Sequence, residues 1–74
     1  MPRSVELVGS FDDWKVWHPL HFDETTKQWV IVLILPVGTY QYKYVLEGHF
    51  WVTSDADETQ LDNAGNLNNV LRLC

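Results

Sequence analysis

The stretch Tyr40–Val52, YQYKYVLEGHFWV, decides the fold of this 74-residue chain. Its first half alternates three tyrosines with Gln41 and Lys43, which is the period of two expected of a β-strand with one apolar face. Glu47-Gly48 then predicts a tight turn. The residues after the turn, His49–Val52, predict a short returning strand. Together they predict a β-hairpin at the centre of the domain.

Apolar runs on either side of this hairpin predict further strands, at Val5–Val8, Pro19–Phe22, Trp29–Leu35 and Leu67–Leu73. The run Trp29–Leu35 (WVIVLIL) is rich in β-branched residues and almost wholly apolar, as expected of a strand covered on both faces. DETTK after Phe22 predicts a hairpin connection, and Thr53–Gly65 predicts a long acidic loop. No stretch has helical periodicity with caps. About six short strands therefore predict an all-β antiparallel sandwich or barrel.

Composition limits the chain to a single domain over residues 1–74, with its core at about 5–73. Cys74 is the only cysteine, which excludes an internal disulfide and fits a reducing compartment. The net charge of −5 argues against nucleic acid or an anionic membrane as the main partner, since both reward clustered Lys and Arg. No apolar run is long enough to span a bilayer, and the N-terminus does not resemble a signal peptide.

Few residues have the spacing that catalysis or metal binding needs. His18 and His21 have an HxxH spacing, but residues three apart on a strand point to opposite faces, so ordinary surface histidines are favoured over a metal site. The carboxylates fall in predicted turns and loops, where solvated acidic residues are expected. No nucleophile or phosphate-loop motif is present. We therefore expect no catalytic activity, no catalytic residues, no metal and no cofactor.

The tryptophans are the unusual feature of the sequence. Trp29 begins the most apolar run and is expected in the core, whereas Trp14 and Trp17 flank the polar turn GSFDDWKVW and Trp51 follows Gly48. Aromatic side chains exposed on a rigid sheet are typical of binding surfaces. An indole can cover the apolar C–H face of a sugar ring, and Lys43 with the asparagines at 66, 68 and 69 offers hydrogen bonds to its hydroxyls. These residue types fit a neutral carbohydrate better than a nucleic acid.

Three motifs, VELVGSFDDW, LPVGTYQYKYVLEG and DNAGNLNNVL, in this order, resemble the glycogen-binding domain of AMP-activated protein kinase beta subunits. More broadly they resemble the family-forty-eight carbohydrate-binding modules, also found in plant phosphoglucan phosphatases and in starch-branching and debranching enzymes. The resemblance implies an early-set immunoglobulin-like antiparallel β-sandwich. It also implies non-catalytic binding of α-1,4-linked glucans such as glycogen, starch, maltooligosaccharides or cyclodextrin.

The resemblance implies roles for individual residues. Trp14 corresponds to a tryptophan that stacks on glucose, Lys43 to a lysine that bonds sugar hydroxyls, and Asn68 to an asparagine that contacts sugar. Asn69 corresponds to a structural residue. The second stacking tryptophan follows the turn, where this chain has Phe50 and then Trp51; we favour Trp51 outward and Phe50 in the core, because Phe has no polar atom to satisfy.

Four departures from the family pattern bear on the site. Ala64 stands where the kinase subunits have a leucine, and Asn66 replaces a threonine but remains a candidate sugar contact. Relative to the family, one extra residue separates Trp14 from Pro19, and this stretch contains Trp17. Trp17 is expected to extend or shield the sugar-stacking surface of Trp14. The family's first edge strand is lacking before Val5.

We therefore expect a module that targets a kinase complex or a glucan-metabolising enzyme to polysaccharide, in the cytoplasm, or in a plastid if the source is a plant or alga. The alternative is a protein-interaction sandwich with a lapsed sugar site, docking other subunits of a kinase complex. A homodimer through a free edge at Val5–Val8 is a further expectation.

Overall fold

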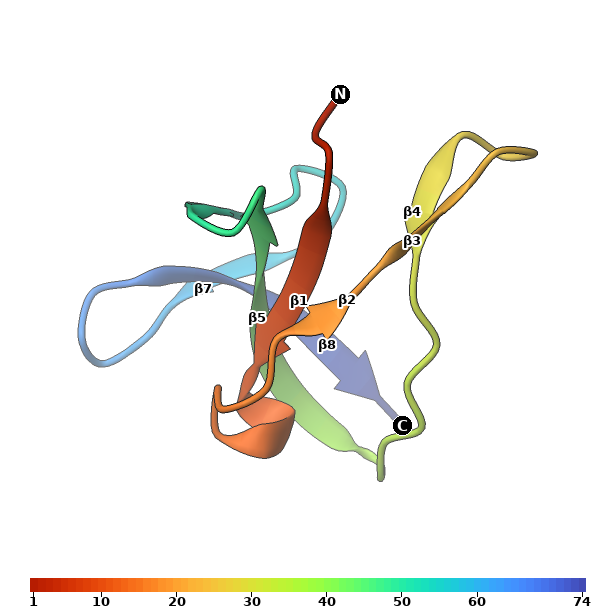
Figure 1. Cartoon of the computed structure of the whole chain (residues 1–74). Helices are drawn as coiled ribbons and strands as arrows, with labels where there is room; N and C mark the ends of the chain where they lie inside the picture. Colours follow the sequence, from red (N-terminus) through yellow and green to blue (C-terminus); the bar gives the residue numbers. More distant parts are fainter.

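The computed structural model describes residues 1–74 as an all-β chain with antiparallel strands (Figure 1). Its elements are β1 (Val5–Gly9), the 3-10 turn η1 (Ser10–Asp12), β2 (His18–Pro19), β3 (His21–Asp23), β4 (Gln28–Val30), β5 (Gly38–Leu46), β6 (Phe50–Val52), β7 (Thr59–Leu61) and β8 (Leu67–Leu73). β5, the longest, organises the main sheet, whose order is β2-β1-β5-β8-β7 with β6 paired to β5. The expected antiparallel, immunoglobulin-like β-sandwich is confirmed.

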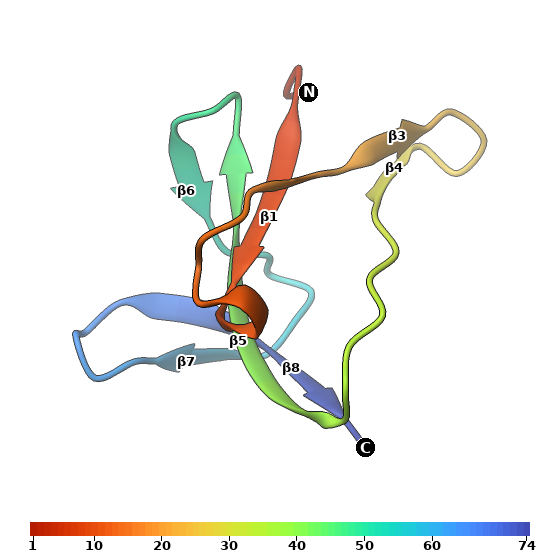
Figure 2. The same cartoon turned by 60° about the horizontal axis from the view of Figure 1, so that its bottom comes forward.

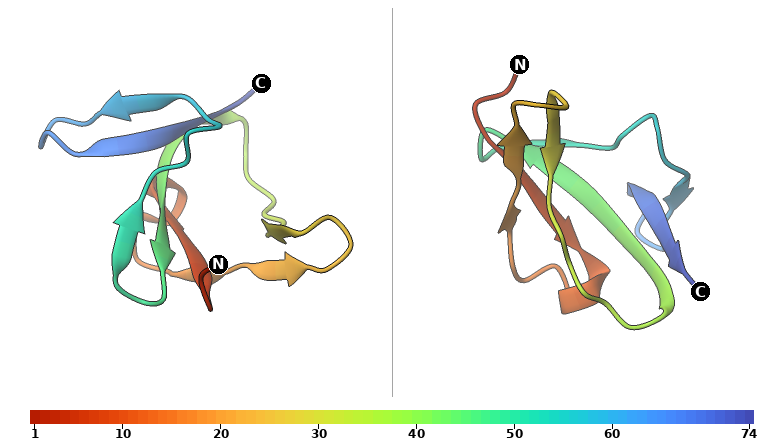
Figure 3. Two further views of the ribbon diagram at one scale, coloured as in Figure 1. Left: turned by 90° about the horizontal axis from the view of Figure 1, so that it is seen from above. Right: turned by 90° about the vertical axis from the view of Figure 1, so that its right-hand side faces the viewer.

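β5 exchanges one neighbour for another along its length. At Tyr42 it pairs with Gly9 of β1 on one edge and with Asn69 of β8 on the other. Further along, from Tyr44 onward, β6 takes the place of β8. The β7–β8 hairpin therefore lies across one end of β5, away from the β5–β6 hairpin (Figure 3). Lys43 stands at the point of exchange.

Alternation along β5 separates two faces of the sheet. We call the face of Tyr42 and Tyr44 the inner face and the face of Lys43 and Val45 the outer face. Ile31, Leu33 and Leu35 cover the inner face, where they line an apolar cavity of about 260 Å³ together with both tyrosines and side chains of β1, η1 and β8. Burial raises the pKa of both tyrosines, and Tyr42 also donates a hydrogen bond of 2.5 Å to Asp57 Oδ2. The inner face is the apolar core between the two layers.

The predicted strand Trp29–Leu35 is wrong in extent and in its two-sided burial. β4 ends at Val30, and no main-chain hydrogen bond joins residues 31–37 to other backbone. This segment runs alone from β4 to β5 (Figure 2). Its outward side chains Val32 and Ile34 are 89% and 97% exposed. The apolar pattern correctly predicts that Ile31, Leu33 and Leu35 face the core. No further strand pairs with the open edge of this segment.

Two further predictions about the sheet are corrected. Val5–Val8 is not a free edge, because β1 pairs with both β5 and β2. The acidic stretch Thr53–Gly65 is not all loop, since β7 lies within it and pairs with β8. The exposed side chains of β7 give it no apolar alternation by which a strand would be recognised.

The two predicted turns are confirmed. Glu47 and Gly48 both have positive φ (53° and 77°), and the N–H of His49 donates to the carbonyl of Leu46 at 3.1 Å. This is the two-residue hairpin geometry whose twist matches that of the flanking strands. DETTK joins β3 to β4, with the N–H of Thr25 donating to Asp23 Oδ1 at 2.9 Å.

Trp29, expected in the core, is half-buried in this small hairpin and packs edge-to-face on Phe22, with ring centroids 5.3 Å apart. No helix of the structure has the length and apolar character needed to cross a bilayer.

Candidate functional site

An open pocket of about 450 Å³ lies on the outer face, beside the point where β5 exchanges β8 for β6. Three parts of the chain meet there: the loop after η1, the β5–β6 hairpin and the connection between β7 and β8. The lining side chains are Trp14, Lys43, Trp51, Asp62, Asn66 and Asn68. Five of the six candidate site residues therefore line one pocket, and Asp62 is an addition that was not among the predicted site residues.

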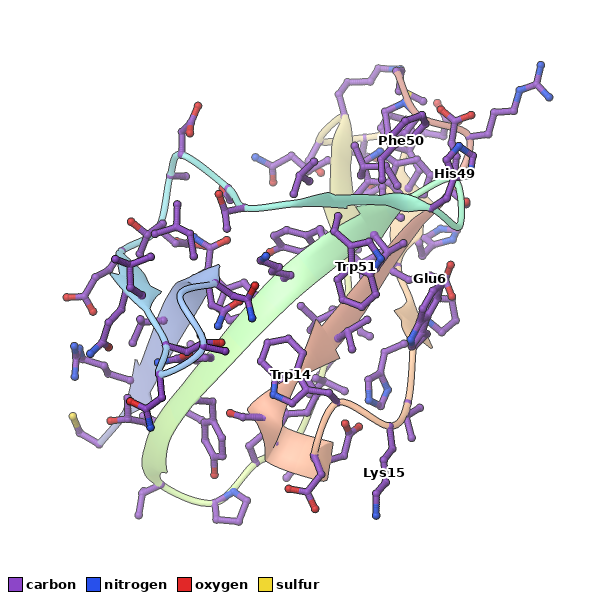
Figure 4. All side chains as sticks on the ribbon, turned by 90° about the vertical axis from the view of Figure 1, so that its left-hand side faces the viewer. Glu6, Trp14, Lys15, His49, Phe50 and Trp51 are labelled. Atoms are coloured by element: carbon purple, nitrogen blue, oxygen red, sulfur yellow. The ribbon has the colours of Figure 1, made fainter.

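Strand register places Lys43 and Trp51 on the same side of the sheet. Lys43 lies opposite Val8 of β1, and Trp51 of β6 lies opposite Val45, two residues further along β5. Because positions two apart on a strand share a face, both side chains point outward. Val8 and Val45 are fully buried on this same face, so the pocket overlies a small apolar layer. Figure 4 shows Trp14 and Trp51 on this side of the sheet.

Phe50 is not in the core, and the prediction that it is buried is wrong. It lies opposite Leu46, so it does share the inner face, but it directly follows the turn, at the end of the sheet. There it is 55% exposed and stacks on His49, with ring centroids 4.1 Å apart. Figure 4 shows both residues at the turn end of the β5–β6 hairpin, away from Trp14. Of the two aromatic residues after the turn, only Trp51 lines the pocket.

The GSFDDW motif fixes the loop that carries Trp14. Ser10 Oγ accepts a hydrogen bond of 2.9 Å from the N–H of Gln41, which ties the loop to β5. Gly9 is required for this contact, because a Cβ there would meet the Phe11 ring and would lie only 2.8 Å from the Gln41 carbonyl. The loop then closes with the N–H of Trp14 donating to the carbonyl of Gly9 at 2.8 Å.

Trp14 is held in an unusual backbone conformation. Asp13 and Trp14 have φ of 59° and 63°, in the left-handed region that bulky side chains rarely adopt. Such a residue costs on the order of 1–3 kcal/mol and persists only where its surroundings impose it. Such strain is concentrated at functional sites more often than elsewhere. Here the strained backbone belongs to Trp14, one of the two tryptophans that line the pocket.

Trp17 does not line the pocket but supports one of its walls. Its ring lies edge-to-face with that of Trp51, with centroids 5.5 Å apart and an interplanar angle of 89°. Next to it, His18 Nε2 lies 2.7 Å from Asp12 Oδ2, a contact that closes the loop between η1 and β2. His21 lies apart on β3, and no group of three or more His, Cys, Asp or Glu side chains gathers in the structure.

The polar wall of the pocket is a connected hydrogen-bond network around Asp62. Asp62 Oδ1 accepts the backbone N–H groups of Ala64 and Asn66, each at 2.9 Å. Asn68 Nδ2 donates to Asp62 Oδ2 at 3.1 Å and to Gln41 Oε1 at 2.9 Å. The N–H of Asn66 is the first cause that holds the pKa of Asp62 below its usual value. The only signal in the sequence is the DNAG stretch, since an Asp followed by such residues favours a turn closed by its own side chain.

Asn69 is structural, as expected, and takes no part in the pocket. It points to the inner side of β8, is fully buried, and exchanges hydrogen bonds with the backbone of Ser54: its Oδ1 accepts at 2.7 Å and its Nδ2 donates at 3.0 Å. The same amide nitrogen lies 3.3 Å from the carbonyl of Glu58. Asn69 thereby holds residues 54–58 against the sheet.

Fold and pocket together define the class of protein: a small antiparallel β-sandwich with a pocket lined by aromatic and polar side chains on one face of its sheet. Within that class, the chain belongs to the family described as the glycogen recognition site of AMP-activated protein kinase, which it matches over residues 2–74.

Similar proteins include kinase subunits and a phosphatase. SNF1-related protein kinase regulatory subunit beta-2 of Arabidopsis thaliana is 31% identical over 71 residues, covering 96% of this chain and 24% of its own length. The human 5′-AMP-activated protein kinase subunit beta-2 is 30% identical, with 96% and 25% covered. The amyloplastic phosphoglucan phosphatase DSP4 of Castanea sativa is 29% identical over 70 residues, with 95% and 19% covered. The chain thus spans about a fifth to a quarter of these relatives.

Proposed function

We propose that this chain binds neutral α-1,4-linked glucan in the pocket of Trp14 and Trp51, as a non-catalytic module. The observation that carries the proposal is that two partly exposed indoles, those of Trp14 and Trp51, line one pocket together with Lys43 on one face of the sheet. Indole faces cover the apolar C–H side of a glucose ring, while the ammonium group and the amides beside it bond the hydroxyl rim.

The charge of the site supports a neutral ligand. Lys43 and Asp62 are the only charged side chains that line the pocket, and their charges are opposite. The chain as a whole carries a net charge of −5, which disfavours polyanions. A glucan has no charge to be repelled.

The pocket is open and few groups line it, so the affinity should be modest. We expect dissociation constants from micromolar to millimolar, or about −4 to −8 kcal/mol. Such an affinity suits a module that attaches a larger protein to a polymer with many equivalent sites, since linked binding events reinforce one another. Because relatives of this chain include kinase regulatory subunits and a phosphoglucan phosphatase, we propose that it targets a kinase complex or a glucan-metabolising enzyme to glycogen or starch.

The test is co-sedimentation with glycogen and with amylopectin, together with calorimetric titration by maltoheptaose. Trp14→Ala should abolish retention in a chain that still folds, with a lowered melting temperature because the indole is partly buried. His49→Ala is the matched control, because it removes an exposed ring outside the pocket and should retain binding. If the wild-type chain is retained on neither polymer, glucan binding is refuted.

A second function, association with another polypeptide, is favoured by residues 31–37. This segment is extended, lacks main-chain partners, and exposes Val32 and Ile34. We propose that a second copy pairs with it antiparallel, because the stretch Val30–Val37 carries no charged residue that would repel its own copy across a twofold axis.

Sedimentation velocity over a range of concentrations tests this association. The wild-type chain should dimerise as its concentration rises, and Ile34→Lys should remain monomeric. Leu61→Lys, at an exposed apolar position on β7, is the control and should dimerise like the wild type. A wild-type chain that is monomeric at all concentrations refutes the homodimer.

A further inference from the structure

Asp62 sets the direction of the hydrogen bonds along the polar wall of the pocket. An ionised carboxylate has about four acceptor positions and no donor. Two are filled at Oδ1 by the N–H groups of Ala64 and Asn66, and one at Oδ2 by Asn68 Nδ2. One acceptor position on Oδ2 therefore remains, on a side chain that lines the pocket.

The amide of Asn68 cannot turn over while Asp62 is ionised. Its Nδ2 has two hydrogens, and the bonds to Asp62 Oδ2 and Gln41 Oε1 use both. The reversed amide would place Asn68 Oδ1 against the Asp62 carboxylate, which offers no proton. Because Asn68 is only 2% exposed, water cannot readily relieve such a clash. Asn68 is therefore left without a donor for a ligand.

The part of this wall formed by Asp62 and Asn68 thus presents acceptors rather than donors. Asp62 Oδ2 and Asn68 Oδ1 both require a partner that carries a hydrogen atom. A glucose hydroxyl supplies one. A phosphate ester in the same place brings acceptor oxygens and a negative charge, so it meets the carboxylate with both hydrogen-bond mismatch and repulsion.

We propose that Asp62 is the specificity-determining residue of this pocket, selecting unmodified glucan over phosphorylated glucan. The proposal rests on the glucan-binding function proposed above and names the ligand more narrowly. The Asp62 carboxyl is ionised at neutral pH, and the Asn66 N–H that lowers its pKa below the ordinary value of 3.8 extends this charged state toward lower pH. Lys43 attracts phosphate and acts in the opposite direction.

The experiment compares maltotriose with maltotriose phosphorylated on every 6-hydroxyl, by calorimetry on the wild type, Asp62→Asn and Asp55→Asn. Asp62→Asn retains an oxygen for the Ala64 and Asn66 N–H groups but removes the charge. Asp55→Asn makes the same change of charge at an exposed position outside the pocket. Since Lys43 is present in all three, any change in the ratio of affinities belongs to the substituted carboxylate.

We expect the wild type and Asp55→Asn to bind unmodified maltotriose more tightly than the phosphorylated sugar, and to the same degree. In Asp62→Asn the ratio of affinities should move toward the phosphorylated sugar by roughly five- to tenfold, as removal of a like charge a few ångströms away in water predicts, because Lys43 is then unopposed. An unchanged ratio in Asp62→Asn, with maltotriose still bound by the wild type, overturns the role of Asp62 and leaves the glucan-binding function standing. A wild type that binds neither sugar overturns both.

Discussion

Replacing Trp51 with Leu tests how the β5–β6 hairpin divides its two aromatic residues between binding and stability. Trp51 is 46% exposed, so roughly half of the 150–250 Å² that a tryptophan can bury is buried, or about 100 Å². At about 25 cal/mol per Å² this area contributes about 2.5 kcal/mol, and a leucine recovers more than half of it. The expected loss of unfolding free energy is therefore about 1 kcal/mol.

The same substitution should weaken glucan binding more than its effect on stability implies. The exposed half of the indole is the part that faces the pocket, and a leucine offers no flat face to a sugar ring. Loss of such an aromatic contact costs about 1–2 kcal/mol, or roughly five- to thirtyfold in affinity. Tryptophan fluorescence titrated with maltoheptaose measures this loss, and urea unfolding measures the stability.

Phe50→Leu is the matched control, because it makes a similar change one residue earlier. Phe50 lies on the inner face beyond the end of the core and stacks on His49, so its replacement should leave maltoheptaose affinity unchanged. With 55% of its surface exposed, it should also cost less than about 1 kcal/mol of stability. If Phe50→Leu weakens binding and Trp51→Leu does not, the assignment of Trp51 to the pocket is wrong.

Three other substitutions or conditions follow from the hydrogen bonds and close contacts. Gly9→Ala should lower the melting temperature and weaken binding together, because its Cβ would collide with Phe11 and the Gln41 carbonyl; thermal melts and maltoheptaose titration measure both. Asn69→Ala should cost about 1–3 kcal/mol in urea unfolding, because it leaves the partly buried backbone of Ser54 without these partners. The pKa of Asp62 is lowered from 3.8 in the folded chain, so its contribution to stability is present above that pH and is lost as the pH falls through the lower, folded value. Melting temperatures recorded from pH 6 to pH 2 should therefore fall less steeply for Asp62→Asn than for the wild type, and parallel curves would contradict this.

The sequence predicted those features whose physical cause is local. The alternation of tyrosines with Lys43 predicts the two faces of β5. The structure has these two faces, because successive side chains of a strand point to opposite sides of the sheet. The Glu47-Gly48 turn is equally local. Trp14, Lys43 and Trp51 were named from residue types and a resemblance, and the structure places them around one pocket.

Features that depend on distant parts of the chain were missed. An apolar run such as WVIVLIL has the same pattern whether or not a strand lies along its outer edge, so the exposure of Val32 and Ile34 could not be read from it. Phe50 shares the inner face with the core residues of β5, but it lies past the last of the core side chains. Only the packed sheet reveals where the core ends. Asp62 was not named as a site residue, because the turn signal of DNAG does not indicate that its carboxylate accepts a hydrogen bond from Asn68 on β8.

The alternation of β5 makes binding and folding depend on the same register. Tyr42 and Tyr44 hold the core from one side of the strand while Lys43 serves the pocket from the other. An insertion or deletion of a single residue within Gly38–Leu46 would therefore send the ammonium group into the apolar layer and a phenol into the pocket. Over evolution the length of β5 should therefore be conserved, and a loss of glucan binding should arise from substitutions on the outer face rather than from insertions or deletions in this strand.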